Sequence, residues 1–233
     1  MMRGAEVEER TAGEPEGKPA KRPYGSLRRA AQAEVTRADI ARAARHLFLD
    51  RGWAATTVRD VAREAGVSVP TVYAVYGNKS GLARALADAA DLSADPGRLL
   101  AALEAPGVAP AGQLAAMAAF DRRLFERAGE VIALVREAGR SEPELATFYA
   151  DGRRRADETR TGVFTSWPPG VLRPGVDPRT AADVYAALCT VDVYRTLTVE
   201  RGWSAERVEQ WWIEALAREL LAQVPEAPAA TGG

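Results

Sequence analysis

The sequence is poor in the residues that most catalytic and metal sites need. Its 233 residues include one cysteine, Cys189, and one histidine, His46. One cysteine forms no internal disulfide, and a single His and Cys give no zinc cluster. No Ser/His or Cys/His dyad can be completed away from His46, which we interpret as a structural or surface residue. We therefore expect no metal, no cofactor and no enzymatic activity.

Long apolar segments are also lacking. No run approaches the ~18 apolar residues that a membrane helix requires, and the stretch Met1–Glu6 lacks the apolar core of a secretory signal. No Gly-rich phosphate loop of the Gly-x-Gly-x-x-Gly or Walker type occurs. These absences predict a cytoplasmic protein without a membrane partner.

The small net charge of −1 hides an uneven distribution along the chain. Residues 1–20 carry −2, residues 21–84 carry +7 and residues 85–233 carry −6. Such an asymmetry is a recognised hint of nucleic-acid binding. The hydrophobic share of 47% is meanwhile enough for a packed core.

Helical periodicity runs through most of the chain, and no segment shows sustained two-residue alternation. The fold class predicted is all-α, with a first helix that begins at a Thr36/Asp39 capping box and ends at Gly52. A short helix is expected from Thr57 to Gly66, and a second short helix begins at Ser68. The next helix is expected from Asn78 to about Ala90. The remaining helices are predicted at 95–104, 111–139 with a break near Gly129, 143–166 after a Ser141/Glu144 capping box, 178–201 and 205–224.

Composition and periodicity divide the chain into four segments. We expect a disordered basic arm at 1–33, a first helical domain at 34–93, a larger helical domain at 94–225, and a disordered tail at 226–233. The arm contains four basic residues that can follow DNA phosphates, unless the arm is simply a solvated tail: Lys21, Arg22, Arg28 and Arg29.

The most informative stretch is residues 57–76, TVRDVAREAGVSVPTVYAVY. Ala62 supplies a small residue where two short helices touch, and Gly66 accepts a left-handed turn. Apolar residues at the required offsets anchor both helices from beneath. This pattern predicts a helix-turn-helix at 57–76, whose second helix lies in the major groove of DNA.

The same region resembles the DNA-binding domain of TetR-type (TetR/AcrR) transcriptional regulators over about fifty residues. Tyr76 stands where the family more often has Phe, and Ala74 and Val75 replace residues that are often polar or aromatic. Segments near Tyr194 and Trp203 resemble the closing helices of the family. The residues that carry the first resemblance are Ile40, Leu47, Phe48, Gly52, Trp53, Thr56, Thr57, Val58, Val61, Ala62, Ala65, Gly66, Val67, Ser68, Thr71, Val72, Tyr73, Tyr76, Lys79 and Leu82.

Several of these residues are predicted to contact double-stranded DNA. Thr71 can bond a base edge or a phosphate, while Pro70 and Ala74 offer apolar contact. The hydroxyls of Tyr73 and Tyr76 can reach phosphates, and the resemblance implies that Lys79 contacts the DNA backbone. Thr57 and Ser68 present hydroxyls at helix N-termini, where phosphates bind well. The DNA-binding set is Thr57, Ser68, Pro70, Thr71, Tyr73, Tyr76 and Lys79.

The resemblance further implies a homodimer on a palindromic operator, joined through helices at about 178–201 and 205–224. Apolar faces on both segments support this, although the same faces can instead close the protomer's own core. The resemblance also implies a pocket for a small-molecule effector, for which an apolar or aromatic ligand suits the candidate wall residues. The candidates are Phe120, Phe148, Trp167, Tyr185 and Cys189.

These features predict a sequence-specific transcriptional regulator, and a repressor rather than an activator because no extra recruiting domain is seen. The alternative is a helical regulator that binds partner proteins and no DNA. The triplet Arg153–Arg155 is interpreted as an exposed turn of helix, with pairing to an anionic ligand as its alternative.

Overall fold

The computed structural model describes residues 24–222, except for the side chains of residues 24–27 and 91–92. The tail predicted at 226–233 and most of the arm predicted at 1–33 lie outside the described residues. Contacts divide the chain into a unit that ends at Thr36 and a second that begins at Arg37. The second unit contains the features discussed below.

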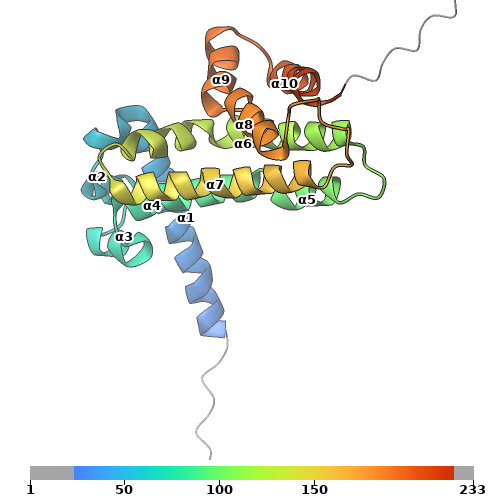
Figure 1. The fold of residues 1–233 in the computed structure, drawn as a ribbon. Coiled ribbons are helices and arrows are strands. Elements are labelled where there is room, and N and C mark those ends of the chain that lie inside the picture. The colour runs from blue at the N-terminus through green and yellow to red at the C-terminus, as the bar shows by residue number, and fades with distance from the viewer. Residues whose placement is uncertain (1–23, 223–233) are drawn as a thin grey trace, which may run out of the picture. The chain divides into compact units, whose positions relative to one another are not determined.

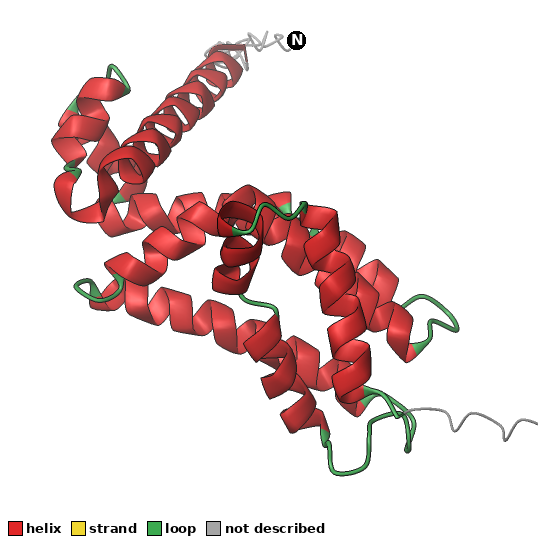
Figure 2. Cartoon of the chain, turned by 90° about the horizontal axis from the view of Figure 1, so that it is seen from above, coloured by secondary structure: helices red, strands yellow, loops and turns green. Residues whose placement is uncertain are grey.

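Apart from an isolated bridge between Leu172 and Leu221, the regular elements among the described residues are all helices, which confirms the all-α fold class (Figures 1 and 2). None of the described helices is both long and apolar enough to cross a membrane. The helices are α1 (Tyr24–Ala55), α2 (Val58–Glu64), α3 (Val69–Tyr76), α4 (Lys79–Ser93), α5 (Pro96–Leu103), α6 (Pro110–Ala138), α7 (Pro143–Thr165), α8 (Pro178–Leu188), α9 (Val191–Arg195), the π-helical segment η1 (Thr196–Glu200) and α10 (Ala205–Leu220).

Helix α1 begins well before its predicted start. The helix covers residues 24–33, which belong to the predicted arm, and it continues through Thr36 without a break. Residues 27–34 are mostly Leu, Arg, Ala, Gln and Glu, all good helix formers, so local propensity favours this extension. The predicted end is correct, because Gly52 has φ +81° and interrupts the helix there.

Two predicted features of α6 and α7 are also wrong. Helix α6 is unbroken at Gly129, where a Cβ atom would lie 3.3 Å from Val191, so the glycine allows α9 to approach. No capping box starts α7. Its N-cap is Glu142, which makes no side-chain capping bond, and Glu144 instead pairs with Arg84 at 2.8 Å.

The helix predicted at 178–201 is divided after Leu188. Cys189 leaves helical geometry at ψ +70°, and the Thr190 hydroxyl caps α9 by accepting the Val193 amide at 3.1 Å. The Trp212 indole donates to the Leu188 carbonyl at 3.0 Å and so satisfies one of the carbonyls freed by the break. This break brings Thr190 and Val191 to the wall of the cavity described below.

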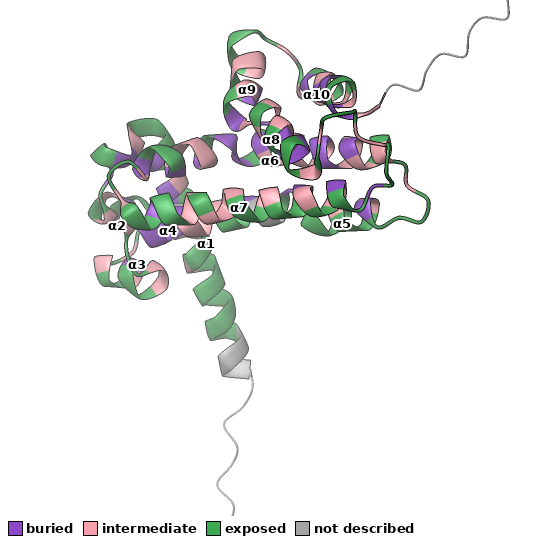
Figure 3. Ribbon diagram, viewed as in Figure 1, coloured by how far each residue is buried: buried purple, intermediate pink, exposed green. Residues whose placement is uncertain are grey.

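Two hydrophobic clusters hold the second unit together. The first joins α1 to α4 and continues into α6 and α7 through Val131, Val135 and Leu145. The second joins α5 to α10, with Tyr185 and Trp212 among its fully buried members. Figure 3 shows buried residues along α6, which belongs to both clusters. Complete burial of one such aliphatic or aromatic side chain contributes roughly 1.5–3 kcal/mol.

The apolar faces of α8 to α10 serve mainly the protomer's own core. Among the apolar residues of these helices, those buried in the second cluster include Ala181, Val191, Val208, Trp212, Leu216 and Leu220. Val184, Leu188, Leu197 and Trp211 are only partly buried, and Val199 is 72% exposed. The apolar surface left for a partner is therefore narrower than the sequence pattern indicated.

Candidate nucleic-acid interface and cavity

Helices α2 and α3 form the predicted helix-turn-helix. Ala62 is buried, and Gly66 in the turn has φ +66°. The Val67 amide donates to the Ala62 carbonyl at 2.9 Å and closes the turn. From beneath, Val61 and Val72 anchor α2 and α3 in the first hydrophobic cluster. One face of α3 is thereby fixed to the domain while its other face stays accessible.

Both helices begin at the predicted caps. The Thr57 hydroxyl accepts the Asp60 amide at 3.1 Å, and the Asp60 carboxylate accepts the Thr57 amide at 3.1 Å. Thr57 also donates its hydroxyl to Asp60, and these bonds hold the pKa of Asp60 below its ordinary value. At the next cap, Ser68 accepts the Thr71 amide at 3.2 Å. The two cap hydroxyls therefore already take part in local bonds.

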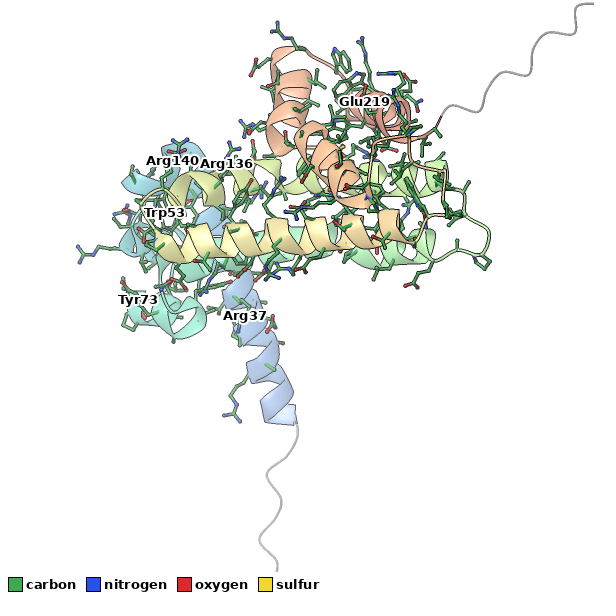
Figure 4. The ribbon with its side chains drawn as sticks, in the orientation of Figure 1. Arg37, Trp53, Tyr73, Arg136, Arg140 and Glu219 are labelled. Atoms are coloured by element: carbon green, nitrogen blue, oxygen red, sulfur yellow. The ribbon has the colours of Figure 1, made fainter. Side chains whose placement is uncertain are left out.

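The outward face of α3 is open to solvent. Pro70 and Ala74 are exposed and Tyr73 is 50% exposed, whereas Thr71 is half-buried. The Thr71 and Ser68 hydroxyl oxygens lie 2.7 Å apart, which orients Thr71 at the start of the helix. Figure 4 shows Tyr73 on α3. Ser68, Pro70, Thr71 and Tyr73 thus lie close together along the first part of α3.

Tyr76 and Lys79 instead have partners inside the protein. The Tyr76 hydroxyl donates to the Arg37 carbonyl at 2.9 Å and links the end of α3 to α1. The Lys79 ammonium donates to the Trp53 carbonyl and lies 4.1 Å from the centre of the Trp53 ring. Burial lowers the pKa of Lys79, and the nearby Glu142 opposes this effect. Both side chains help to position the domain.

Arg59 is a cation that the sequence analysis overlooked. It lies in the first turn of α2, two residues after Thr57, and is exposed. By contrast, the neighbouring Arg63 is paired with Asp60 at 2.7 Å. Position alone could have indicated Arg59, because the first turn of α2 contains the predicted contact Thr57.

A cavity of about 580 Å³ lies among α4 to α9. Its size falls within the range of small-molecule sites. Phe120, Phe148 and Tyr185 line it, as predicted for a ligand pocket. Trp167 and Cys189 do not. Trp167 packs edge-on against Phe164 and donates to Gln113, and Cys189 is buried in the second cluster, where burial raises the pKa of its thiol.

A buried polar network forms part of the cavity wall. Asp121 and Arg160 are 4% and 7% exposed, and their side chains pair at 3.1 Å. The Tyr185 hydroxyl donates to the same Asp121 oxygen at 2.9 Å, and the Arg160 guanidinium lies 4.6 Å from the Tyr185 ring centre. Burial raises the pKa of Tyr185 well above its ordinary value, so the hydroxyl remains a donor. Of this network, the sequence analysis identified Tyr185 alone.

Comparison with known proteins assigns the first part of this unit to a family. Residues 40–86 match the family model described as bacterial regulatory proteins, tetR family. The HTH-type transcriptional regulator AlkX of Mycobacterium tuberculosis is 43% identical over 70 residues. That match covers 30% of this chain and 31% of AlkX, less than two thirds of the relative.

The fold extends further than the sequence match. NalD, the secondary repressor of the MexAB-OprM multidrug efflux pump in Pseudomonas aeruginosa, superposes with a TM-score of 0.70 at 22% identity, over 81% of this chain and 98% of NalD. SmeT in complex with triclosan gives 0.67 at 20% identity, over 85% of this chain and 97% of SmeT. AlkX is named a transcriptional regulator and NalD a repressor, in agreement with the expectation of a regulator rather than an enzyme. Residues 40–86 thus match the tetR family of bacterial regulatory proteins, and the chain shares the fold of NalD and SmeT.

Proposed function

We propose that this protein is a sequence-specific, DNA-binding transcriptional regulator that inserts α3 into the major groove. The observation that carries the proposal is the accessible outer face of α3, presented by a capped helix-turn-helix inside the matched segment 40–86. The +7 charge of residues 21–84 favours the approach to phosphates. The domain at 34–93 binds DNA, and the segment at 94–225 binds the effector and the second protomer.

Each residue of the proposed interface has a distinct task. Thr71 contacts a base edge, with Pro70 giving apolar contact beside it, and Tyr73 donates its hydroxyl to a phosphate. Arg59 adds a second phosphate contact. Four further residues hold the helices at the DNA, and their free hydrogen-bonding groups contact the DNA backbone: Thr57, Ser68, Tyr76 and Lys79.

The active species in this proposal is a homodimer on a palindromic operator. The last helices, α8 to α10, form its interface, to which Val199 and the partly buried Trp211 contribute apolar area. With ~6–10 phosphate contacts, affinity should fall roughly 10³- to 10⁵-fold between about 50 and 200 mM salt.

The regulation proposed is repression that a small apolar or aromatic ligand relieves. Phe120, Phe148 and Tyr185 provide the cavity wall for that ligand. The ligand acts by binding the DNA-competent and DNA-incompetent states with different affinity. Val135 links the two regions, since it lines the cavity and also belongs to the first hydrophobic cluster.

The test compares α3 and α2 variants on DNA. Tyr73→Phe and Arg59→Gln should weaken binding to every duplex by a similar factor, because each loses a phosphate contact. Thr71→Ala should change the sequences selected from a random duplex library. Arg140→Gln is the matched control, since Arg140 is exposed and pairs with Glu137 near the end of α6 (Figure 4).

The opposite results would refute this docking. If Thr71→Ala changes neither affinity nor preference, α3 does not read the bases as proposed. If the unaltered protein retains no duplex even at low salt, the alternative of a regulator that binds only protein partners is favoured.

A further inference from the structure

The cavity wall contains more basic side chains than acidic ones. Among the described residues that line it, four are arginines and two are acids. Both acids already have partners, since Asp192 accepts from Arg136 at 2.8 Å and Asp121 accepts from Arg160 at 3.1 Å. The arginines are Arg136, Arg153, Arg155 and Arg160, and the acids are Asp121 and Asp192. An excess of positive charge therefore faces the cavity.

The acids of α7 do not neutralise this excess. Asp151 and Glu158 both bind Arg154, at 3.1 and 3.0 Å, and Asp157 binds Arg160 at 3.0 Å. Two lining arginines, Arg153 and Arg155, have no acidic partner within 4.0 Å in the part of the chain that the structure describes, and Arg155 is exposed. Arg153 is half-buried on the cavity wall, where the charge of a guanidinium is screened less than at the surface.

The rest of the wall is mainly apolar. Phe120, Leu124 and Phe125 face the cavity from α6, and Phe148 and Tyr149 face it from α7. A ligand that matches both parts needs an apolar body and one anionic group. A carboxylate fits the half-buried guanidinium of Arg153, because the two can form parallel hydrogen bonds.

We propose that the cavity binds an amphipathic monoanion, an apolar or aromatic molecule that carries one carboxylate, with the carboxylate at Arg153. This inference rests on the proposed function in one respect, since it names the ligand class for the effector site. It refines the effector from an apolar molecule to an anionic one. It also gives Arg153 and Arg154 opposite tasks: Arg153 faces the ligand, and Arg154 pairs on the surface.

The test uses three probes that share one alkyl chain length: decanoate, 1-decanol and decylamine. Binding to the full chain is measured by calorimetry, with no DNA present. Decanoate should bind at least about tenfold more tightly than 1-decanol, and decylamine should bind most weakly. Arg153→Gln should bring decanoate to the level of the alcohol. Arg154→Gln, the matched control, should leave the preference unchanged.

Two outcomes would overturn the inference: equal binding of decanoate and 1-decanol by the unaltered protein, or a preference for decanoate that survives Arg153→Gln. If Arg153→Gln does not fold, the probe series on the unaltered protein still decides. A chain that prefers decanoate but retains no DNA would refute the proposed function and leave the ligand class standing. A chain that selects an operator but shows no decanoate preference would do the reverse.

Discussion

Removing the charge of Asp121 should destabilise the protein strongly, because a buried arginine then loses its carboxylate partner. In Asp121→Asn, Arg160 keeps its charge at 7% exposure and loses the carboxylate 3.1 Å away. Breaking a buried pair by removing one partner costs about 3–5 kcal/mol. Arg160 retains Asp157 at 3.0 Å, so we expect the lower end of that range, about 3 kcal/mol.

Urea unfolding of a double-mutant cycle measures this effect. Asp121→Asn together with Arg160→Met should cost less than the sum of the two single changes, because the double variant has no stranded charge. Asp157→Asn is the control, and because Asp157 is 44% exposed its loss should cost less than about 1 kcal/mol. If the two single changes add within about 0.5 kcal/mol, the pair is not coupled and the reasoning fails.

Three further predictions follow from single contacts. Gly81→Ala should disrupt the DNA-binding domain, because a Cβ atom there would lie 1.9 Å from the Tyr76 carbonyl oxygen; unchanged DNA affinity and melting temperature would contradict this. Tyr76→Phe should cost about 1 kcal/mol in urea unfolding by removing the bond to the Arg37 carbonyl, and a cost near zero would count against that bond. Because Arg136 lowers the pKa of Asp192, their pair contributes stability above the pKa of an unfolded aspartate and loses it as pH falls through the lowered value. Asp192→Asn should therefore flatten this part of the curve of unfolding free energy against pH. The change should be less than about 1 kcal/mol, because the pair is largely exposed, and an unchanged curve would refute the pairing.

The helix-turn-helix could be predicted from the sequence because its determinants are local. The Thr57/Asp60 box and the turn at Gly66 involve residues within a few positions of each other. The start of α1 is local information as well, but the overall composition of residues 1–33 predicts an arm there. The helix formers within that stretch extend α1 to an earlier start.

Contacts between distant parts of the chain could not be predicted in the same way. Asp121 meets Arg160 39 residues away and Tyr185 64 residues away. Lys79 turns to Trp53, 26 residues earlier. No periodicity encodes such pairings, because they depend on how the helices pack. The same holds for Trp167, whose spacing suits a pocket wall but which packs on Phe164 instead.

The most direct test of the proposed regulator is selection of fragments from the encoding genome by the purified protein at near-physiological salt, followed by sequencing. A dimer that presents two copies of α3 should enrich an inverted repeat whose half-sites are one helical turn of DNA apart, or a multiple of it. Enrichment of no fragment, with no duplex retained at low salt, would contradict the claim that α3 binds DNA.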